Sequence, residues 1–166
     1  ELGNLNILLT LRLNHNQLTG DVPDSFTNLV NLYDPGTFWD GGDGLDLDYN
    51  ALNVPAGYPD PSVPLQVFLS QKDPEWHLLQ GFQQTIGSAG GMLTSLDGRT
   101  EFVFPAGALI TDTTFTFTPQ PVPNYSPARL SDAHNTFLLS AVDAGGTPVI
   151  TFTLPVTVTL SYTDTD

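Results

Sequence analysis

Leucine recurs at fixed spacings in the first third of the chain, and this recurrence limits the possible folds more than any other feature. Residues 5–32 follow the order L-x-x-L-x-x-L-x-L-x-x-N-x-L-T-G-x-V-P-x-x-F-x-x-L-x-x-L, and residues 45–55 repeat its central part. Because side chains alternate along a strand, the L-x-L step places Leu11 and Leu13 on one buried face. A single repeat cannot bury that face alone, so the pattern predicts stacked repeats.

The segment Leu-Thr-Gly-Asp-Val-Pro at residues 18–23 resembles a leucine-rich repeat of the longer, plant-like type. The resemblance implies a solenoid in which Asn16 and Asn50 turn inward and bond the backbone of neighbouring coils. These asparagines lie 34 residues apart, more than the roughly 20 to 29 residues of such repeats, so we expect residues 35–44 to form an inserted loop. Residues 1–4 match the tail of a preceding coil, and upstream coils are expected.

The stretch after the second repeat is predicted to close the solenoid. Residues 65–72 fit a short helix, and the turn Asp-Pro-Glu-Trp ends at Trp76. This stretch resembles the C-terminal cap of bacterial secreted leucine-rich repeat proteins. The resemblance implies that Trp76 covers the open hydrophobic end of the last coil.

The second half of the chain has the pattern of an antiparallel β-sandwich. Asp97-Gly98 between apolar runs indicates a hairpin, and Phe115 and Phe117 alternate with threonine as in a half-buried strand. Further strands are predicted over residues 137–142, 149–152 and 156–162. We therefore predict a mainly β chain, a short leucine-rich repeat solenoid plus an antiparallel β-sandwich-like domain. The predicted boundaries are a repeat domain over 1–80, a linker over 81–89 rich in small residues, and a β-domain over 90–166.

Two motifs in this half carry a second resemblance. Residues 90–99 read Gly-Gly-x-Leu-Thr-Ser-x-Asp-Gly-Arg, and residues 104–109 read Phe-Pro-Ala-Gly-Ala-Leu. They resemble the zonula-occludens/netrin-receptor-type β-domain in its bacterial extracellular form. In relatives further strands follow a Tyr-Thr-Asp segment like residues 162–164, so the resemblance implies a domain that is incomplete at its C-terminus.

Charge and composition exclude several partners. Lys plus Arg number 4 against 18 Asp plus Glu, for a net charge of −14, the wrong sign for neutralising phosphates or an anionic bilayer. No apolar run reaches the roughly 18 residues of a membrane helix. Cysteine is absent, which excludes disulfides and zinc-thiolate sites. We expect a protein or surface glycan partner, no nucleic acid and no membrane insertion.

Catalytic motifs are not found in the sequence. His15, His77 and His134 fall in separate segments without the spacing of a metalloprotease helix, and no phosphate-binding loop or serine nucleophile elbow is present. We therefore expect a non-enzyme without cofactor.

Acidic residues cluster around the start of the second repeat. Asp40, Asp43, Asp46, Asp48 and Asn50 offer oxygen ligands of the kind calcium prefers. Their spacing differs from that of an EF-hand, so two interpretations stay open: a calcium site or a solvated acidic loop.

The residues between the inward leucines form the predicted binding surface. They point out of the solenoid sheet, where such arrays bind partners, and the Phe38-Trp39 pair in the insertion either joins them or plugs the solenoid edge. The predicted partner-binding residues are Arg12, Asn14, His15, Phe38, Trp39, Asp46, Asp48 and Tyr49. We expect a non-catalytic protein-binding or adhesion region of a secreted or surface-displayed bacterial protein, located extracellularly or at the cell surface. The alternative is an accessory, non-catalytic region of a large exported enzyme.

Overall fold

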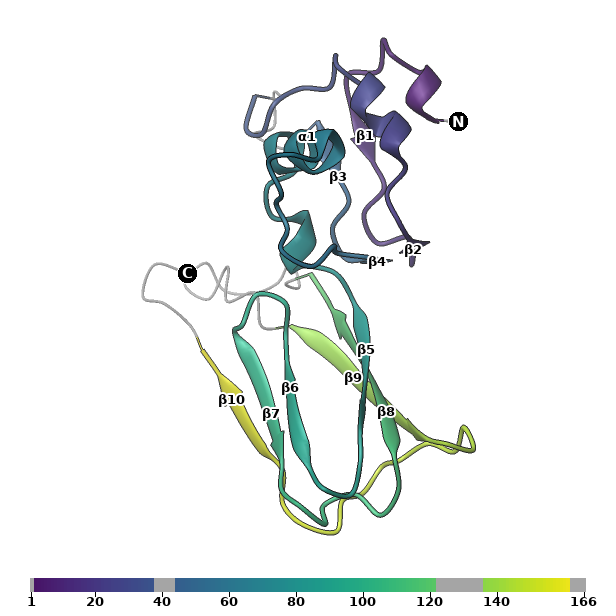
Figure 1. The fold of residues 1–166 in the computed structure, drawn as a ribbon, viewed down its shortest axis with the longest axis vertical. Helices are drawn as coiled ribbons and strands as arrows, with labels where there is room; N and C mark the ends of the chain where they lie inside the picture. Colours follow the sequence, from purple (N-terminus) through teal and green to yellow (C-terminus); the bar gives the residue numbers. More distant parts are fainter. Residues whose placement is uncertain (1, 38–43, 122–135, 162–166) are drawn as a thin grey trace. The chain divides into compact units, whose positions relative to one another are not determined.

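The chain is mainly β and divides into two compact units, unit 1 over Glu1–Gln80 and unit 2 over Gly81–Asp166. The structure is a computed structural model that describes residues 2–37, 44–121 and 136–161 (Figure 1). Unit 1 contains the 3₁₀ helices η1 (Leu2–Asn4), η2 (Asp24–Asn28) and η3 (Trp76–Leu78), the helix α1 (Pro64–Lys72), and the strands β1 (Leu11–Arg12), β2 (Thr19–Gly20), β3 (Leu45–Asp46) and β4 (Ala51–Leu52). Unit 2 contains β5 (Phe82–Ile86), β6 (Gly91–Thr94), β7 (Thr100–Phe104), β8 (Thr113–Pro119), β9 (Phe137–Asp143) and β10 (Thr157–Leu160).

The two sequence repeats of unit 1 lie side by side with their strands parallel. We call residues 11–32 the first repeat and residues 45–55 the second repeat. Strand β1 pairs with β3, and β2 pairs with β4. The pairing continues past β1, because the N–H of Leu13 donates to the carbonyl of Asp46. Leucines of both repeats fill one core, in which Leu29, Leu45 and Leu47 are buried.

Asn50 joins the two repeats from a buried position, with 2% of its surface exposed. Its Oδ1 accepts hydrogen bonds from the backbone N–H groups of Asn16 and Leu18, each at 3.0 Å. Its Nδ2 donates to the carbonyls of Leu13 and Leu47, each at 2.9 Å. The inward orientation predicted for this asparagine is confirmed.

Asn16 differs from that prediction, because its side chain is exposed. Among the residues that the structure describes, its Nδ2 donates only within its own repeat, to the carbonyls of Leu13 and Asn14. The physical reason is that β1 has β3 on one side and, among the described residues, no strand on the other. An asparagine becomes buried here only when a neighbouring repeat covers it.

Side chains close the opposite side of the second repeat. The buried Asp73 accepts from the N–H of Leu47 at 2.7 Å. The buried Gln80 accepts from the N–H of Leu52 at 3.1 Å and donates to the carbonyl of Leu47 at 3.0 Å. Trp76 is 1% exposed and packs into the same core. Asp73 and Gln80 thus hydrogen-bond the backbone of the second repeat, as Asn50 bonds the backbone of the first repeat.

The helix expected over residues 65–72 is present as α1. Pro64 occupies its first turn, where a missing N–H costs nothing. At its other end Lys72 reaches back across the unit, and its Nζ donates to the Leu32 carbonyl and to the Asp34 carboxylate, both at 2.7 Å. The helix is thereby joined to the end of the first repeat.

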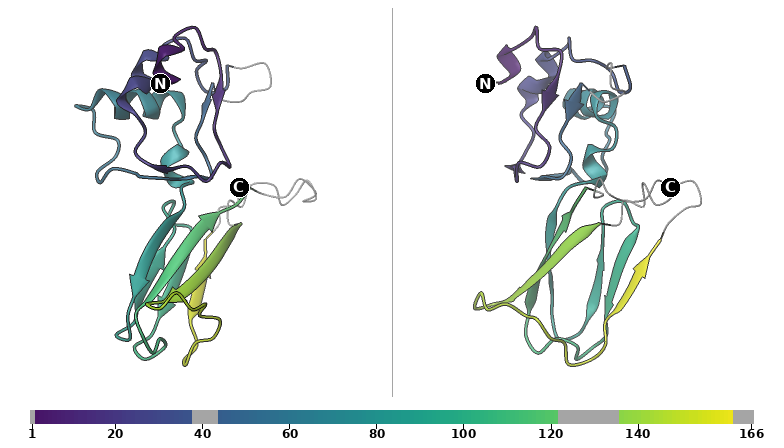
Figure 2. Two further views of the ribbon diagram at one scale, coloured as in Figure 1. Left: turned by 90° about the vertical axis from the view of Figure 1, so that its right-hand side faces the viewer. Right: turned by 180° about the vertical axis from the view of Figure 1, so that it is seen from behind.

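Unit 2 consists of two antiparallel three-stranded sheets with the strand orders β10-β7-β6 and β5-β8-β9. The strands form two layers (Figure 2), and both sheets contribute to a single phenylalanine-rich core. In β8 buried residues alternate with half-buried threonines, and the rings of Phe104 and Phe115 lie 4.6 Å apart. The alternation predicted around Phe115 and Phe117 is confirmed.

The sequence motifs of unit 2 serve its turns. The hairpin predicted at Asp97-Gly98 joins β6 to β7, with the Asp97 carboxylate accepting from the N–H of Arg99 at 3.0 Å. Gly98 adopts a φ of 72°, which suits glycine. Gly90 also has a positive φ, and a Cβ there would lie 2.4 Å from the carbonyl oxygen of Phe104. Glycine is therefore required at residue 90 on steric grounds.

Two sequence predictions for this half are wrong. Residues 82–86, assigned to the linker, form β5 and pair with β8, because Phe82 and Ile86 pack into the core. The strand expected over residues 149–152 is absent. The N–H of Val149 donates to the Ala141 carbonyl, and just after this stretch the N–H of Thr153 donates to the Ala108 carbonyl. Prolines border this stretch and the residues after it, and proline has no N–H to donate to a strand ladder.

On the outer face of the β5-β8-β9 sheet, hydroxyl and amide groups bond across β5 and β8, while β9 adds the exposed Leu138 and Val142. Thr85 and Thr114 share a hydrogen bond between their hydroxyls at 3.0 Å. Gln83 donates to the hydroxyl of Thr116 at 3.1 Å. Cross-strand pairs of this kind stabilise a sheet.

Within the described ranges, no helix has the length and apolar character needed to cross a membrane.

Candidate functional site

The candidate site is the row of outward side chains along the paired strands of unit 1. We call it the strand strip and define it by the six described residues Arg12, Asn14, His15, Asp46, Asp48 and Tyr49. The register pairs Arg12 directly with Asp46, and residues paired in parallel strands project to the same side of the sheet. The strip therefore contains a cationic group beside a carboxylate.

The strip ends in a stacked pair of rings. His15 and Tyr49 lie with ring centroids 4.5 Å apart and planes inclined by 10°. Both residues have a positive φ, 57° and 56°, a conformation that residues other than glycine adopt rarely. Because the same backbone turn occurs at the same place in both repeats, the two rings stack on each other. His15 is exposed and Tyr49 half-buried, so the pair offers a flat aromatic surface.

Three carboxylates of unit 1, which we call the acidic trio, lie close together. Asp46, Asp48 and Asp73 each place an oxygen within 4.8 Å of the other two. The Asp46 carboxylate accepts a hydrogen bond from the N–H of Asp48 at 3.2 Å. One oxygen of Asp73 accepts a hydrogen bond from the N–H of Leu47. Asp73 is not among the residues predicted from the sequence, since it lies beyond the second repeat and returns to it only through α1. Its position in the Lys-Asp-Pro turn was the available signal.

This geometry changes the set of residues that could bind calcium. Asn50 cannot serve as a ligand as it stands, because its oxygen accepts two backbone N–H groups. Asp40 and Asp43 lie outside the described residues, as do Phe38 and Trp39 of the predicted binding surface. The described carboxylates that could hold a cation are those of the acidic trio.

Of the two remaining histidines, the described one, His77, lies outside the strip. His77 contacts the ring of Tyr58, with centroids 4.7 Å apart, and burial lowers its pKa below the ordinary value of 6.5, against the opposing effects of the Pro74 backbone and Glu75. Tyr58 accepts a hydrogen bond from the indole Nε1 of Trp76 at 2.9 Å. Burial raises the pKa of Tyr58, and the hydrogen bond with Trp76 opposes this. This cluster belongs to the cap, and His134 lies outside the described residues.

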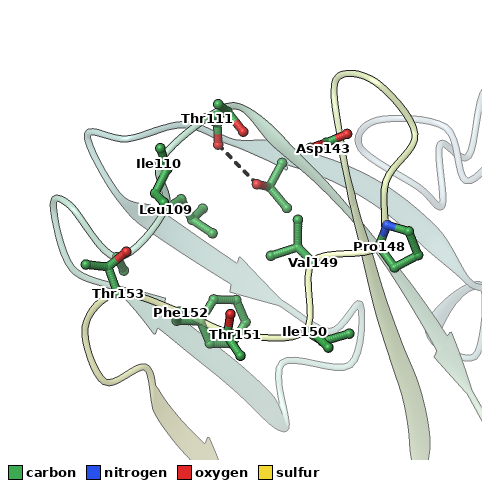
Figure 3. A pocket seen from close by; sticks show the side chains of 12 residues that line it. Leu109, Ile110, Thr111, Asp143, Pro148, Val149, Ile150, Thr151, Phe152 and Thr153 are labelled. Atoms are coloured by element: carbon green, nitrogen blue, oxygen red, sulfur yellow. Dashed lines mark hydrogen bonds between the residues drawn. The ribbon is translucent and has the colours of Figure 1, made fainter.

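Unit 2 contains a hollow of about 510 Å³ between the turn at residues 108–111 and the extended segment 148–153. Apolar side chains, among them Phe152, and threonines line it (Figure 3), and the Thr113 hydroxyl donates a hydrogen bond to the Thr111 carbonyl. Its one carboxylate, Asp143, accepts from the N–H groups of Gly145 and Thr147. The hollow thus offers a mixed apolar and hydroxyl surface, while the strand strip offers charges and rings.

Comparison with known proteins gives no match: no protein-family model, no curated protein and no solved structure matches this chain. No residue role is therefore transferred from a relative. The leucine-rich repeat and the zonula-occludens/netrin-receptor resemblances stay predictions.

Proposed function

We propose that this chain is a non-catalytic binding or adhesion region of a secreted or surface-displayed bacterial protein, acting outside the cell. Unit 1 is proposed to be two coils and the C-terminal cap of a leucine-rich repeat solenoid, with the strand strip as its recognition surface. Support comes from the parallel pairing of β1 with β3 and from the side-chain bonds of Asn50 and Gln80.

Unit 2 is proposed to be a β-sandwich-like spacer of the zonula-occludens/netrin-receptor type. Its two antiparallel sheets share one core. Asp97 and Gly98 of the family-like motif form a hairpin turn, and Gly107 donates its N–H to the Ser88 carbonyl at 2.8 Å. These motif residues have structural roles, which fits a spacer.

The observation that carries the binding proposal is the stacked His15–Tyr49 pair beside Arg12 and Asp46. Aromatic and arginine side chains dominate protein interfaces energetically, and flat rings also stack on the apolar faces of sugars. A mixed row of charges supplies hydrogen bonds to either ligand. The partner we propose is therefore a protein or a surface glycan.

The test is a binding screen with the full chain immobilised on a biosensor, against a panel of extracellular matrix proteins and a glycan array. For any ligand found, Tyr49→Ala and His15→Ala should each weaken binding about tenfold or more. Gln71→Ala, at an exposed position of α1, is the matched control and should leave binding unchanged. Equal affinity of Tyr49→Ala and the unmodified chain would contradict the strand strip as the site.

A further inference from the structure

A hollow of about 440 Å³ lies beside the helix α1 in unit 1, and we call it the α1 groove. This volume is within the range of about 300 to 1,000 Å³ that is typical of ligand sites. Three segments contribute to its lining, residues 21–24 after β2, residues 53–58 after β4 and residues 63–69 at α1, together with Trp76. None of the six strand strip residues is in the lining, so the α1 groove is a separate surface.

The most buried side chains of the α1 groove are apolar and are held in place. Val22, Leu69 and Trp76 are 8%, 2% and 1% exposed. The Trp76 indole meets the Tyr58 ring edge-to-face with centroids 5.5 Å apart, and its Nε1 donates to the Tyr58 hydroxyl at 2.9 Å. The groove therefore offers a preformed apolar surface, and a ligand binds there without the entropy cost of ordering it.

Two carboxylates lie on the side of the groove formed by the first repeat. Asp21 and Asp24 are exposed, and Asp21 accepts a hydrogen bond from the Asn53 Nδ2 at 2.8 Å. The lysine and arginine residues within residues 1–80 are Arg12 and Lys72. Arg12 belongs to the strand strip, and the Lys72 ammonium is bonded at the end of the first repeat. In the part of the chain that the structure describes, neither Asp21 nor Asp24 therefore has a cationic partner.

Two hydrogen-bond donors lie on the side of the groove formed by α1 and the turn before it. The Gln66 Oε1 accepts from the N–H of Asp60 at 2.7 Å, which leaves its Nε2 as a donor. The Tyr58 oxygen accepts from Trp76, which leaves the hydroxyl proton to donate. Among the described residues no acceptor is bonded to either donor. The groove thus presents acceptors for a cation on one side and donors for carbonyl oxygens on the other.

We propose that the α1 groove binds a cationic peptide segment of another protein. A lysine ammonium of the peptide bonds Asp21 and Asp24, and an apolar neighbour of that lysine packs on the apolar lining. The net charge of −14 favours a positively charged partner and opposes a second copy of this chain. The proposal does not rest on what the strand strip binds.

The donors favour a peptide over a small aliphatic amine. A peptide has carbonyl oxygens that accept from Gln66 and Tyr58, whereas an amine has none. The aliphatic stem of a lysine also covers apolar surface while its charged end reaches a carboxylate. The occupant is therefore a lysine flanked by apolar residues in an extended segment.

The test titrates the ¹⁵N-labelled full chain with three capped tripeptides and follows the NMR spectrum. The peptides are acetyl-Leu-Lys-Leu-amide, acetyl-Leu-Glu-Leu-amide and acetyl-Gly-Lys-Gly-amide. The chain has two tryptophans, and Trp39→Phe identifies the indole N–H signal of Trp76. Because this indole donates to Tyr58, a ligand bonded to Tyr58 shifts the signal.

We expect acetyl-Leu-Lys-Leu-amide to shift the Trp76 signal saturably, with a Kd about tenfold or more below that of the other two peptides. Asp21→Asn and Asp24→Asn should each raise its Kd about threefold, because each removes one exposed ion pair. Asp112→Asn removes the same charge from an exposed position of unit 2 and is the matched control, with an unchanged Kd. Tyr49→Ala should also leave the Kd unchanged, because Tyr49 belongs to the strand strip.

Several results would overturn the proposal. The absence of a shift, or equal shifts with the glutamate peptide, would exclude a cation site in the groove. Equal affinity for the glycine peptide would mean attraction to surface charge alone. Equal affinity for pentylammonium would replace the peptide with a small amine. A weaker Kd in Tyr49→Ala would place the peptide on the strand strip.

Discussion

Replacing Asn50 with alanine measures how much of unit 1 depends on one buried side chain. The substitution removes the acceptor of two backbone N–H groups, those of Asn16 and Leu18. The three carbonyls that Asn50 bonds keep a partner, because Leu13 also accepts from Asn16, Leu47 from Gln80 and Asp48 from the N–H of His15. Only the two donors are left without a partner. At about 1 to 3 kcal/mol for each buried group, and with both sites only partly buried, the free energy of unfolding should fall by about 2 to 4 kcal/mol.

The assay is urea unfolding of the full chain followed by tryptophan fluorescence, which reports unit 1 because both tryptophans lie there. Asn16→Ala is the matched control, since it removes the same side chain from an exposed position and should cost less than about 1 kcal/mol. A loss in Asn50→Ala no larger than that in Asn16→Ala would refute the reasoning. It would mean that water satisfies the two N–H groups at no cost.

Three further predictions concern other parts of the chain. His77 has a lowered pKa in the folded state, so the unfolded chain binds the proton more tightly. Unit 1 should therefore have its full stability above about pH 6.5 and lose stability as the pH falls below that value. His77→Gln should flatten the profile of Tm against pH. Gly90→Ala should destabilise unit 2 by about 3 kcal/mol, because the new Cβ clashes with the Phe104 carbonyl. Gly98→Ala has open space around the new Cβ and should cost about 1 kcal/mol. Calorimetry of the two variants compares these costs, and equal costs would contradict the clash. Trp39→Ala should weaken ligand binding without changing the Tm, and a lower Tm in the absence of ligand would instead favour a plug at the repeat edge.

The sequence predicted the stacking of the repeats because the spacing of leucine and asparagine is a local property. It predicted that the leucines and Asn50 turn inward, and the structure buries Leu45, Leu47 and Asn50. The predicted burial of Asn16 was wrong, because burial depends on which neighbour covers a side chain. The sequence of a repeat does not specify that neighbour. The role of Asp73 was equally hidden, since its contact with Leu47 spans 26 residues.

In unit 2 the alternation of apolar and polar residues predicted β8 and β9, because the alternation continues over several residue pairs in each strand. It missed β5, because Gln84 occupies an inward register position opposite Phe115 and interrupts the apolar pattern. The side chain is tolerated there because it lies at a sheet edge, where Nε2 donates to the Met92 carbonyl at 2.8 Å. A polar residue in an edge strand conceals the strand from a reading of hydrophobicity alone.

The hydroxyl face of the β5-β8-β9 sheet has a consequence for how the two units respond to their surroundings. The side chains of Gln83, Thr85, Thr114 and Thr116 do not ionise, so their cross-strand bonds are the same in acid and at neutral pH, and added salt does not screen them. The acidic trio of unit 1 has the opposite character, because both protons and salt change the repulsion among its carboxylates. A change of pH or salt should therefore alter the strand strip of unit 1 while these cross-strand bonds of unit 2 stay the same.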